Sequence, residues 1–522
     1  MDLIRRLGPW PFLCGALTLL SQAASSPDLA ASPDLAMGRA VYDQHCAACH
    51  GDTGHGEGPA AVWLLPKPRN FSAGLFKIQS TPSGTLPADA DLLASIRRGL
   101  GGTSMPAFNF LSEAELSAVV GYVKRLTAYT DAEGRSVNRF AEAEALGSVG
   151  APIAVPPEPP LTLASITRGQ EVYAELQCAS CHGERGAGDG PSAPTLVDSF
   201  GVPNPPRDLS TQSFRGGSVG RDLYTRIAVG LAGTAMVAYP DSLVSSEDRW
   251  ALVHFVQSLR RTEVQVTDIL APTEGQLPVV RVDGALPSHP LDPAWDRVES
   301  FPVPLNPLWP EPYPLFAVSV RALHNGQSLA ILLQWRDETF NGAPLRAEDF
   351  QDAAALQFSL TDQIPFLGMG DPQNPVNVWQ WKAGWQEEID GERPDVDLLY
   401  PALHVDMYPE PENHGLYRTA ETAGNLLAAT GLSSPVEDAN ATGFGTMTTQ
   451  APHAQNVGGS GVWRDGFWSV LYHRNLASPD AGDVQFTAGR PALVAFGIWN
   501  GAQRDRNGRK VISHWHRLTL NP

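Results

Sequence analysis

The chain has 522 residues and a formal net charge of −19, with 43% hydrophobic and 18% charged residues. This length suits about three or four folded domains. The acidic balance argues against nucleic acid as a partner and favours basic partner surfaces or simple solubility.

The N-terminus has the features of a secretory signal peptide, which we predict over residues 1–24. Arg5 and Arg6 precede a short apolar stretch that ends in small residues at Ala23 and Ala24. That stretch is short for a membrane span, and no other part of the sequence approaches a spanning length. We therefore expect an exported periplasmic protein that is soluble, without a transmembrane segment in the mature chain, and that meets a membrane only through partners.

Two Cys-x-x-Cys-His motifs come next along the chain. In this motif both thiols form thioether bonds to haem vinyl groups and the histidine binds the iron. The residues concerned are Cys46, Cys49 and His50 in the first copy and Cys178, Cys181 and His182 in the second. A zinc knuckle needs more ligands than either copy offers, and a thioredoxin-like pair needs no histidine. The motifs therefore predict two covalently bound haem c groups.

The similarity between the two copies extends beyond the motif, which indicates an internal duplication. A glycine and a tyrosine on one face of a short helix precede each motif, and a glycine-rich turn that lets backbone approach a porphyrin follows it. Arg69 and Arg207 then occupy matching positions. Each is a candidate partner for a haem propionate, with a solvent-exposed arginine as the alternative.

Each copy continues with a methionine and an amphipathic helix. Met105 and Met236 follow the motif histidines at nearly the same distance, in the contexts Gly-Thr-Ser-Met and Gly-Thr-Ala-Met. The chain has only seven methionines, so the match favours a sixth iron ligand over a core gap-filler. A thioether opposite histidine raises the reduction potential and leaves the iron six-coordinate. The closing helices are predicted over residues 113–126 and 247–259.

These features resemble small class I cytochrome c domains. We predict two all-α domains of this kind, over residues 25–130 and 163–262, joined by a stiff proline-rich linker over 131–162. One cysteine lies in the signal peptide and four bind haem, so none remains for disulfides, iron–sulfur clusters or zinc. A dihaem peroxidase is a less favoured alternative, because it would need an open sixth position at one iron.

Residues 263–522 have a different character, with short runs of β-branched and aromatic residues separated by turn residues. Asn325-Gly326 and Asp465-Gly466 lie between such runs and predict tight hairpins. We predict a β-sandwich over the whole region. The acidic, proline- and glycine-rich stretch 384–460 lacks periodicity and predicts long loops that face a partner.

This third region resembles the haem b-binding gamma subunit of the ethylbenzene dehydrogenase type, which periplasmic molybdoenzymes such as dimethyl sulfide dehydrogenase, selenate reductase and chlorate reductase share. The matching stretches are residues 318–337, 366–372, 379–382, 463–468 and 495–513. In that family a methionine and a lysine bind a non-covalent haem b. The resemblance assigns these roles to Met369 and Lys510 and implies one haem b.

The residues themselves favour the same assignment. The region contains only two lysines, Lys382 and Lys510. Burial against a porphyrin would lower the pKa of a lysine amine and so free its lone pair for iron. A solvated charge at Lys510 and a core role for Met369 are the alternatives. Possible replacement ligands are His404, His473, His514 and His516.

The sequence thus predicts an electron-transfer protein with two haem c and one haem b and with no catalytic residues of its own. The resemblance implies a relay between the iron–sulfur subunit of a molybdenum oxidoreductase and another redox protein, with the substrate chemistry on a partner subunit. An alternative is a third domain that binds a ligand such as carbohydrate without haem, since residues 292–295 also fit that wider group of sandwiches.

Overall fold

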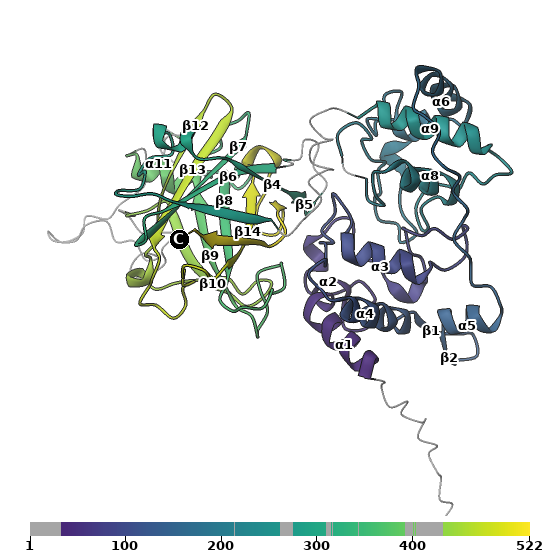
Figure 1. Ribbon diagram of the computed structural model, residues 1–522, viewed down its shortest axis with the longest axis horizontal. Coiled ribbons are helices and arrows are strands. Elements are labelled where there is room, and N and C mark those ends of the chain that lie inside the picture. The colour runs from purple at the N-terminus through teal and green to yellow at the C-terminus, as the bar shows by residue number, and fades with distance from the viewer. Residues whose placement is uncertain are drawn as a thin grey trace, which may run out of the picture.

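The computed structural model describes residues 33–212, 214–260, 275–309, 315, 317–342, 344–391, 400, 402 and 432–521. The predicted signal peptide and His404 lie outside these residues. Two helical domains stand on one side of the molecule and a β domain on the other (Figure 1). No helix in the described ranges is both long and apolar enough to cross a membrane.

The first helical domain is built on two crossing helices near its ends. Its elements are α1 (Pro33–His45), α2 (Ala47–His50), η1 (Ala61–Trp63), η2 (Phe71–Ala73), α3 (Asp89–Arg98), α4 (Glu113–Arg125), β1 (Ala128–Thr130), β2 (Ser136–Asn138) and α5 (Arg139–Ala145). A Cβ on Gly38 of α1 would lie 2.1 Å from the Ala118 carbonyl oxygen of α4, so only glycine allows this close crossing. Tyr42, one turn further on, is fully buried and donates to the Gly51 carbonyl at 2.7 Å.

The second helical domain repeats this construction. Its helices are α6 (Leu163–Glu175), α7 (Ala179–His182), η3 (Ala193–Thr195), α8 (Gly220–Val229) and α9 (Ser246–Ser258). A Cβ on Gly169 would lie 2.0 Å from the Ala251 carbonyl oxygen of α9. Tyr173 donates to the Gly183 carbonyl at 2.7 Å. The duplication inferred from the sequence is therefore also a duplication of packing.

The linker predicted over residues 131–162 is wrong in its first part, which folds onto the first helical domain as β2 and α5. Asn138 caps α5 by accepting from the Phe140 and Ala141 amides, both at 3.1 Å. The Phe140 ring is buried against Phe76. A helix this short, with one large apolar residue, has too little periodicity to stand out from a linker in sequence. The extended segment begins only after residue 147.

The β domain is one long mixed sheet that folds back on itself. Its path is β11-β10-β9-β8-β14-β16-β3-β6-β7-β13-β12, with β15, β4 and β5 beside it. The strands are β3 (Gln276–Arg281), β4 (Phe301–Pro304), β5 (Asn306–Pro307), β6 (Ala317–His324), β7 (Ser328–Arg336), β8 (Ala353–Ser359), β9 (Val376–Lys382), β10 (Val436–Ala441), β11 (Thr448–Thr449), β12 (Gly458–Arg464), β13 (Phe467–Asn475), β14 (Ala492–Trp499), β15 (Val511–Ile512) and β16 (His516–Leu520). Short 3-10 turns lie at η4 (Pro293–Arg297), η6 (Pro452–Ala454) and η7 (Gly501–Gln503).

The two halves of this sheet face each other across one hydrophobic core, which confirms the predicted sandwich. Trp335 and Trp468 from one half pack against Trp381 from the other, with ring centroids 6.4 and 4.7 Å from the Trp381 ring. The Tyr472 hydroxyl also crosses the core and donates to the Ala354 carbonyl at 2.8 Å.

The structure confirms the two predicted hairpin turns but only part of the predicted loop region. Asn325-Gly326 joins β6 to β7, and Asp465-Gly466 joins β12 to β13, as predicted. The prediction of loops over 384–460 is wrong in part, because α11 (Ala383–Ile389), β10, β11 and the start of β12 lie there. In β10, Glu437 and Asp438 are buried and pair with Lys382 and Asn377 of β9. Because its buried residues include two carboxylates, this strand has the polar sequence that is typical of a loop.

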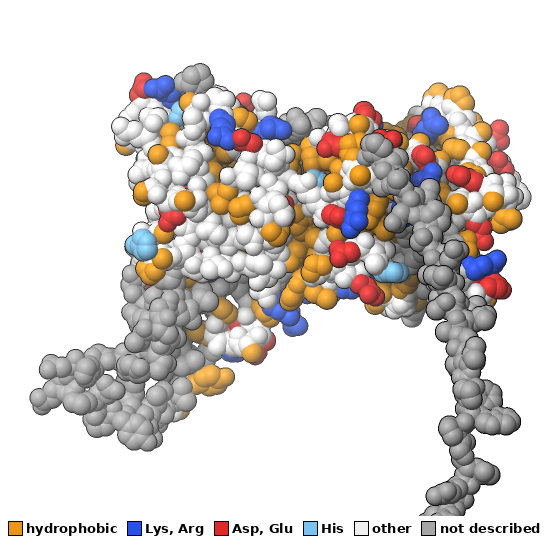
Figure 2. All heavy atoms as spheres, turned by 90° about the horizontal axis from the view of Figure 1, so that it is seen from below, with side chains coloured by type: hydrophobic (Ala, Val, Ile, Leu, Met, Phe, Trp, Pro, Cys, Tyr) orange, Lys and Arg blue, Asp and Glu red, His pale blue; other side chains and the backbone are white. Residues whose placement is uncertain are grey.

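The β domain packs against the first helical domain. The Leu65 amide donates to the Leu308 carbonyl at 3.1 Å, and the Gly102 amide donates to Oδ1 of Asn306 at 3.2 Å. Trp63 covers the loop at Gly508, where a Cβ would lie 2.8 Å from the tryptophan side chain. In Figure 2 hydrophobic side chains gather on the visible face near the junction of the β domain with the helical domains. The first helical domain is therefore in contact with both of its neighbours, because the second one packs against it through Arg207 and Arg226.

Candidate haem centres

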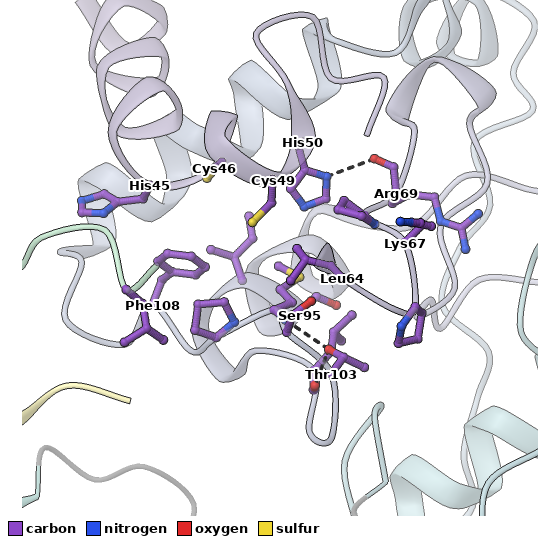
Figure 3. Close-up of a pocket in the computed structure, with 18 of the residues that line it drawn as sticks. His45, Cys46, Cys49, His50, Leu64, Lys67, Arg69, Ser95, Thr103 and Phe108 are labelled. Carbon is purple, nitrogen blue, oxygen red and sulfur yellow. Dashed lines mark hydrogen bonds between the residues drawn. The ribbon is translucent and has the colours of Figure 1, made fainter. Parts of the chain in front are cut away.

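A cavity of the first helical domain holds all four predicted haem residues of that domain. Cys46, Cys49 and His50 come from the start and body of α2, and Met105 comes from the loop after α3. In Figure 3 the Cys49 sulfur and the His50 ring point into the space that Thr103 borders on the opposite side. The other walls are largely apolar, as a porphyrin face requires.

His50 is oriented as an iron ligand would be. Its Nδ1 donates to the Arg69 carbonyl at 3.0 Å, which leaves Nε2 free to bind a metal. The ring stacks on Phe71 with centroids 4.6 Å apart. Burial lowers the pKa of His50 to about 4, so the imidazole is neutral near pH 7.

The methionine loops of the two domains have the same hydrogen bonds. The Met105 carbonyl accepts from the Leu100 amide at 3.1 Å, and the Met236 carbonyl accepts from the Leu231 amide at 3.1 Å. The hydroxyl of Thr103 accepts from the Met105 amide, as that of Thr234 does from the Met236 amide, both at 3.2 Å. The structure therefore holds Met236 in the second domain as it holds Met105 in the first.

Burial favours the protonated form of three of the motif thiols. Burial raises the pKa of Cys46 and of Cys49 to about 12, and that of Cys178 to about 11. Among the described residues no group of three or more His, Cys, Asp and Glu side chains is placed to hold a metal ion. Thiols that end as thioethers need no negative charge, so the environment fits covalent haem attachment.

Met369 and Lys510 lie against one apolar cluster of the β domain. The cluster comprises Ala353, Ala355, Val376, Val378, Ala441 and Trp499, with Met369 and Trp515 packed on it. Met369 has a φ of 77°, a left-handed conformation that costs a non-glycine residue about 1 kcal/mol or more. The Lys510 ammonium lies 4.6 Å from the centre of the Trp499 ring. Burial lowers the pKa of Lys510 to about 8.

Among the other candidate ligands of this domain, Lys382 and His514 have polar partners and His516 lies between two aromatic rings. Lys382 forms a buried ion pair with Glu437 and lies 4.2 Å from the centre of the Trp385 ring. His516 packs between the rings of Phe301 and Phe496. The remaining two in the described chain are His473, which lies on β13, and His514, whose Nε2 is 3.4 Å from Nδ2 of Asn306. The described geometry therefore favours Lys510 over Lys382 as an iron ligand.

The two kinds of site share a wall. Phe366, Leu367 and Gly368, which directly precede Met369, line the cavity of the first helical domain. Leu308 lines it too, and its amide donates to the Lys510 carbonyl at 3.0 Å. Sequence reasoning missed this wall, because it forms only where two distant segments meet at a domain junction.

The two arginines predicted beside propionates both reach between the helical domains. Nη2 of Arg207 donates to the Gly101 and Gly102 carbonyls of the Met105 loop, at 3.1 and 2.9 Å. The Arg69 guanidinium lies 5.5 Å from the centre of the Phe200 ring in the second domain. In Figure 3 this guanidinium points away from His50, whereas the Arg69 backbone carbonyl faces it. The propionate role of both arginines stays a prediction.

Comparison with known families matches all three domains. Residues 33–123 match the family described as cytochrome c oxidase, cbb3-type, subunit III, and residues 166–260 match the cytochrome c family. Residues 292–511 match the ethylbenzene dehydrogenase family. The chain is two cytochrome c domains followed by an ethylbenzene dehydrogenase-type domain. The helical domains are therefore haem c-binding domains.

Curated relatives agree with this composition. A protein of Haloferax mediterranei named as a respiratory nitrate reductase heme subunit is 27% identical over 45% of this chain and 69% of its own length. The gamma subunit of dimethylsulfide dehydrogenase of Rhodovulum sulfidophilum is 28% identical over 48% of this chain and 84% of its own. The gamma subunit of chlorate reductase of Ideonella dechloratans is 24% identical over 48% of this chain and 90% of its own.

Proposed function

We propose that this chain is the electron-relay subunit of an exported molybdenum oxidoreductase complex, with one haem b and two haem c. The shared wall between the Met369–Lys510 site and the first cytochrome cavity carries the proposal. Haem supplies one-electron redox chemistry when bound. The protein supplies axial ligands, apolar walls and a short separation between neighbouring sites.

The relatives support the role of a subunit. Two of them are named as gamma subunits of oxidoreductases and one as a heme subunit. The third domain of this chain resembles haem b-binding subunits of periplasmic molybdoenzymes. This resemblance suggests that an iron–sulfur subunit is the neighbour on the haem b side. The cytochrome domains would then exchange electrons with a second redox protein.

A dihaem peroxidase and a carbohydrate-binding third domain explain fewer features of the structure than an electron relay does. A dihaem peroxidase needs a vacant coordination position at one iron. The loops of Met105 and Met236 have the same hydrogen bonds, so neither methionine is marked as the one that is absent from its iron. A carbohydrate-binding third domain gives no reason for the left-handed backbone at Met369 or for a half-buried lysine packed on Trp499.

Haem inventory and native purification test the proposal. Denaturing electrophoresis with haem staining should retain two haems per chain, and acid-acetone should extract a third. Protein purified under gentle conditions from its source should bring iron and molybdenum with it in metal analysis. A chain with no extractable haem would contradict the relay, and a complex without molybdenum would contradict the proposed partner.

A further inference from the structure

A cluster of cations lies between the two cytochrome c domains. Lys77 and Arg215 occupy equivalent places in the repeat, each directly after a phenylalanine and eight residues after Arg69 or Arg207. Both Lys77 and Arg215 line the cavity that holds His50 and Met105, although Arg215 belongs to the second domain. The cavity of the first domain is therefore partly built by the second.

The arrangement is reciprocal. A Cβ on Gly102 of the Met105 loop would lie 2.6 Å from the Arg207 guanidinium. A Cβ on Gly233 of the Met236 loop would lie 3.3 Å from the Arg69 guanidinium. Each domain thus sends an arginine to the methionine loop of the other, and Lys77 and Arg215 lie among these arginines.

Protein carboxylates compensate this charge poorly. Within the described part of the chain, no carboxylate contributes to the pKa of Arg215, Asp198 is the one that contributes to the pKa of Lys77, and Nε of Arg215 is buried without a hydrogen-bond partner. Nη1 of Arg69 is also buried and unpartnered. Asp198, the acidic neighbour of Arg69 and Lys77, accepts from the amides of its own loop. In a chain of net charge −19 such a cluster calls for an anion.

The pKa of Lys77 is lowered, as expected where positive charges outnumber negative ones. Burial, as the main cause, and the nearby cations Arg215, Arg69 and Arg207 together lower it to about 7. A lysine in this position gains its charge fully only when carboxylates or other anions enter the cluster.

We propose that Arg69, Lys77 and Arg215 form one anion site, shared by the two cytochrome c domains, that binds the propionate carboxylates of both haems. The inference rests on the proposed haem c sites. Two haems bring carboxylates from both sides of the interface, which suits a cluster built from both domains. Lys77 and Arg215 are then positioning residues that set both reduction potentials, and each haem depends on a cation from the other domain.

Arg215→Gln tests the dependence across the domains. In a Met236→Ala background the near-infrared thioether band reports the first-domain haem alone, so a redox titration at that band isolates its potential. Loss of a cation beside the propionates favours the oxidised haem. We expect the redox equilibrium to shift about tenfold toward oxidation, which equals about 59 mV for one electron. Lys77→Gln in a Met105→Ala background should lower the potential of the second-domain haem similarly.

Matched variants separate charge from packing. Arg215→Lys should keep the potential near that of its background, and Arg221→Gln, an exposed position on α8, should change it much less. Equal potentials in the Arg215→Gln and Arg221→Gln proteins, or an effect confined to the second-domain haem, would overturn the shared site. So would a potential that follows phosphate concentration, which would mean a solution anion in the cluster. Haem staining distinguishes these outcomes from a failure of the haem sites, because loss of covalent haem in the unsubstituted chain would contradict the proposed function itself.

Discussion

Lys510 and Met369 combine features that ordinary structural residues avoid. The pKa of Lys510 is lowered to about 8 by burial, so a neutral amine is accessible near pH 7. Met369 keeps a left-handed backbone, and its carbonyl accepts from the Gly443 amide at 2.8 Å. Strain of this kind persists where the surroundings impose it, often at ligand sites.

Replacement of Lys510 should remove haem b and nothing else. Lys510→Ala and Lys510→Met should lose or alter the extractable haem while both covalent haems remain, because the sites lie in separate domains. Lys510→Arg should fail as well, since arginine keeps its proton and offers no lone pair. Acid-acetone extraction and haem staining measure both pools.

Lys382 is the matched comparison for Lys510. Lys382→Met leaves Glu437 buried without its partner, which should lower the free energy of unfolding by about 3 kcal/mol or more. The chains that fold should still bind haem b. Normal haem b in Lys510 variants together with its loss in Lys382→Met would show that the wrong lysine was assigned.

At the scale of elements, each cytochrome c domain depends on one close helix crossing. Gly38 of α1 meets the Ala118 carbonyl of α4, and Gly169 of α6 meets the Ala251 carbonyl of α9. A backbone carbonyl in mid-helix cannot move aside without loss of helical hydrogen bonds. These glycines therefore set how near the terminal helices approach.

Gly38→Ala should destabilise the first cytochrome c domain by about 1–3 kcal/mol, the usual cost of overpacking, or more. Gly121→Ala is the control on α4, because its Cβ would meet nothing within 4 Å. It should stabilise the helix by up to about 1 kcal/mol, since alanine is the better helix former. Denaturant unfolding followed by haem absorbance measures both, and equal effects would contradict the steric explanation.

At the scale of the whole molecule, the first cytochrome c domain is central. On one side, its cavity is lined by the β-domain segment that leads to Met369. On the other side, the cation cluster lies between it and the second cytochrome c domain. Its cavity is lined by residues of all three domains. In the proposed relay, this order places the first haem c between haem b and the second haem c.

Met105→His tests that order. A second histidine in place of a thioether lowers the reduction potential of the middle haem. It should therefore slow electron equilibration between haem b and the second cytochrome c domain. Met236→His should leave exchange between haem b and the first domain unchanged. Rapid reduction with observation at the haem b and haem c bands measures both rates, and unchanged equilibration in Met105→His would point to a direct route.

The sequence by itself determined the haem-attachment chemistry and the domain types. Cys-x-x-Cys-His acts within one turn of chain, so its meaning does not depend on distant contacts. The duplication, the matched positions of Met105 and Met236 and the two hairpin turns are likewise local patterns or comparisons of one stretch with another. The family matches confirm the types of domain that these patterns predicted.

Only the tertiary structure decided how the sites relate to one another. β10 stayed hidden because its buried Glu437 and Asp438 look like loop residues until Lys382 and Asn377 are placed beside them. α5 stayed hidden in a linker because its one large apolar residue gains meaning only against the domain core. The shared wall and the Lys77–Arg215 cluster join residues far apart in the chain, and no local pattern encodes such pairs. Packing of whole domains brings them together, so their chemistry exists only in the folded molecule.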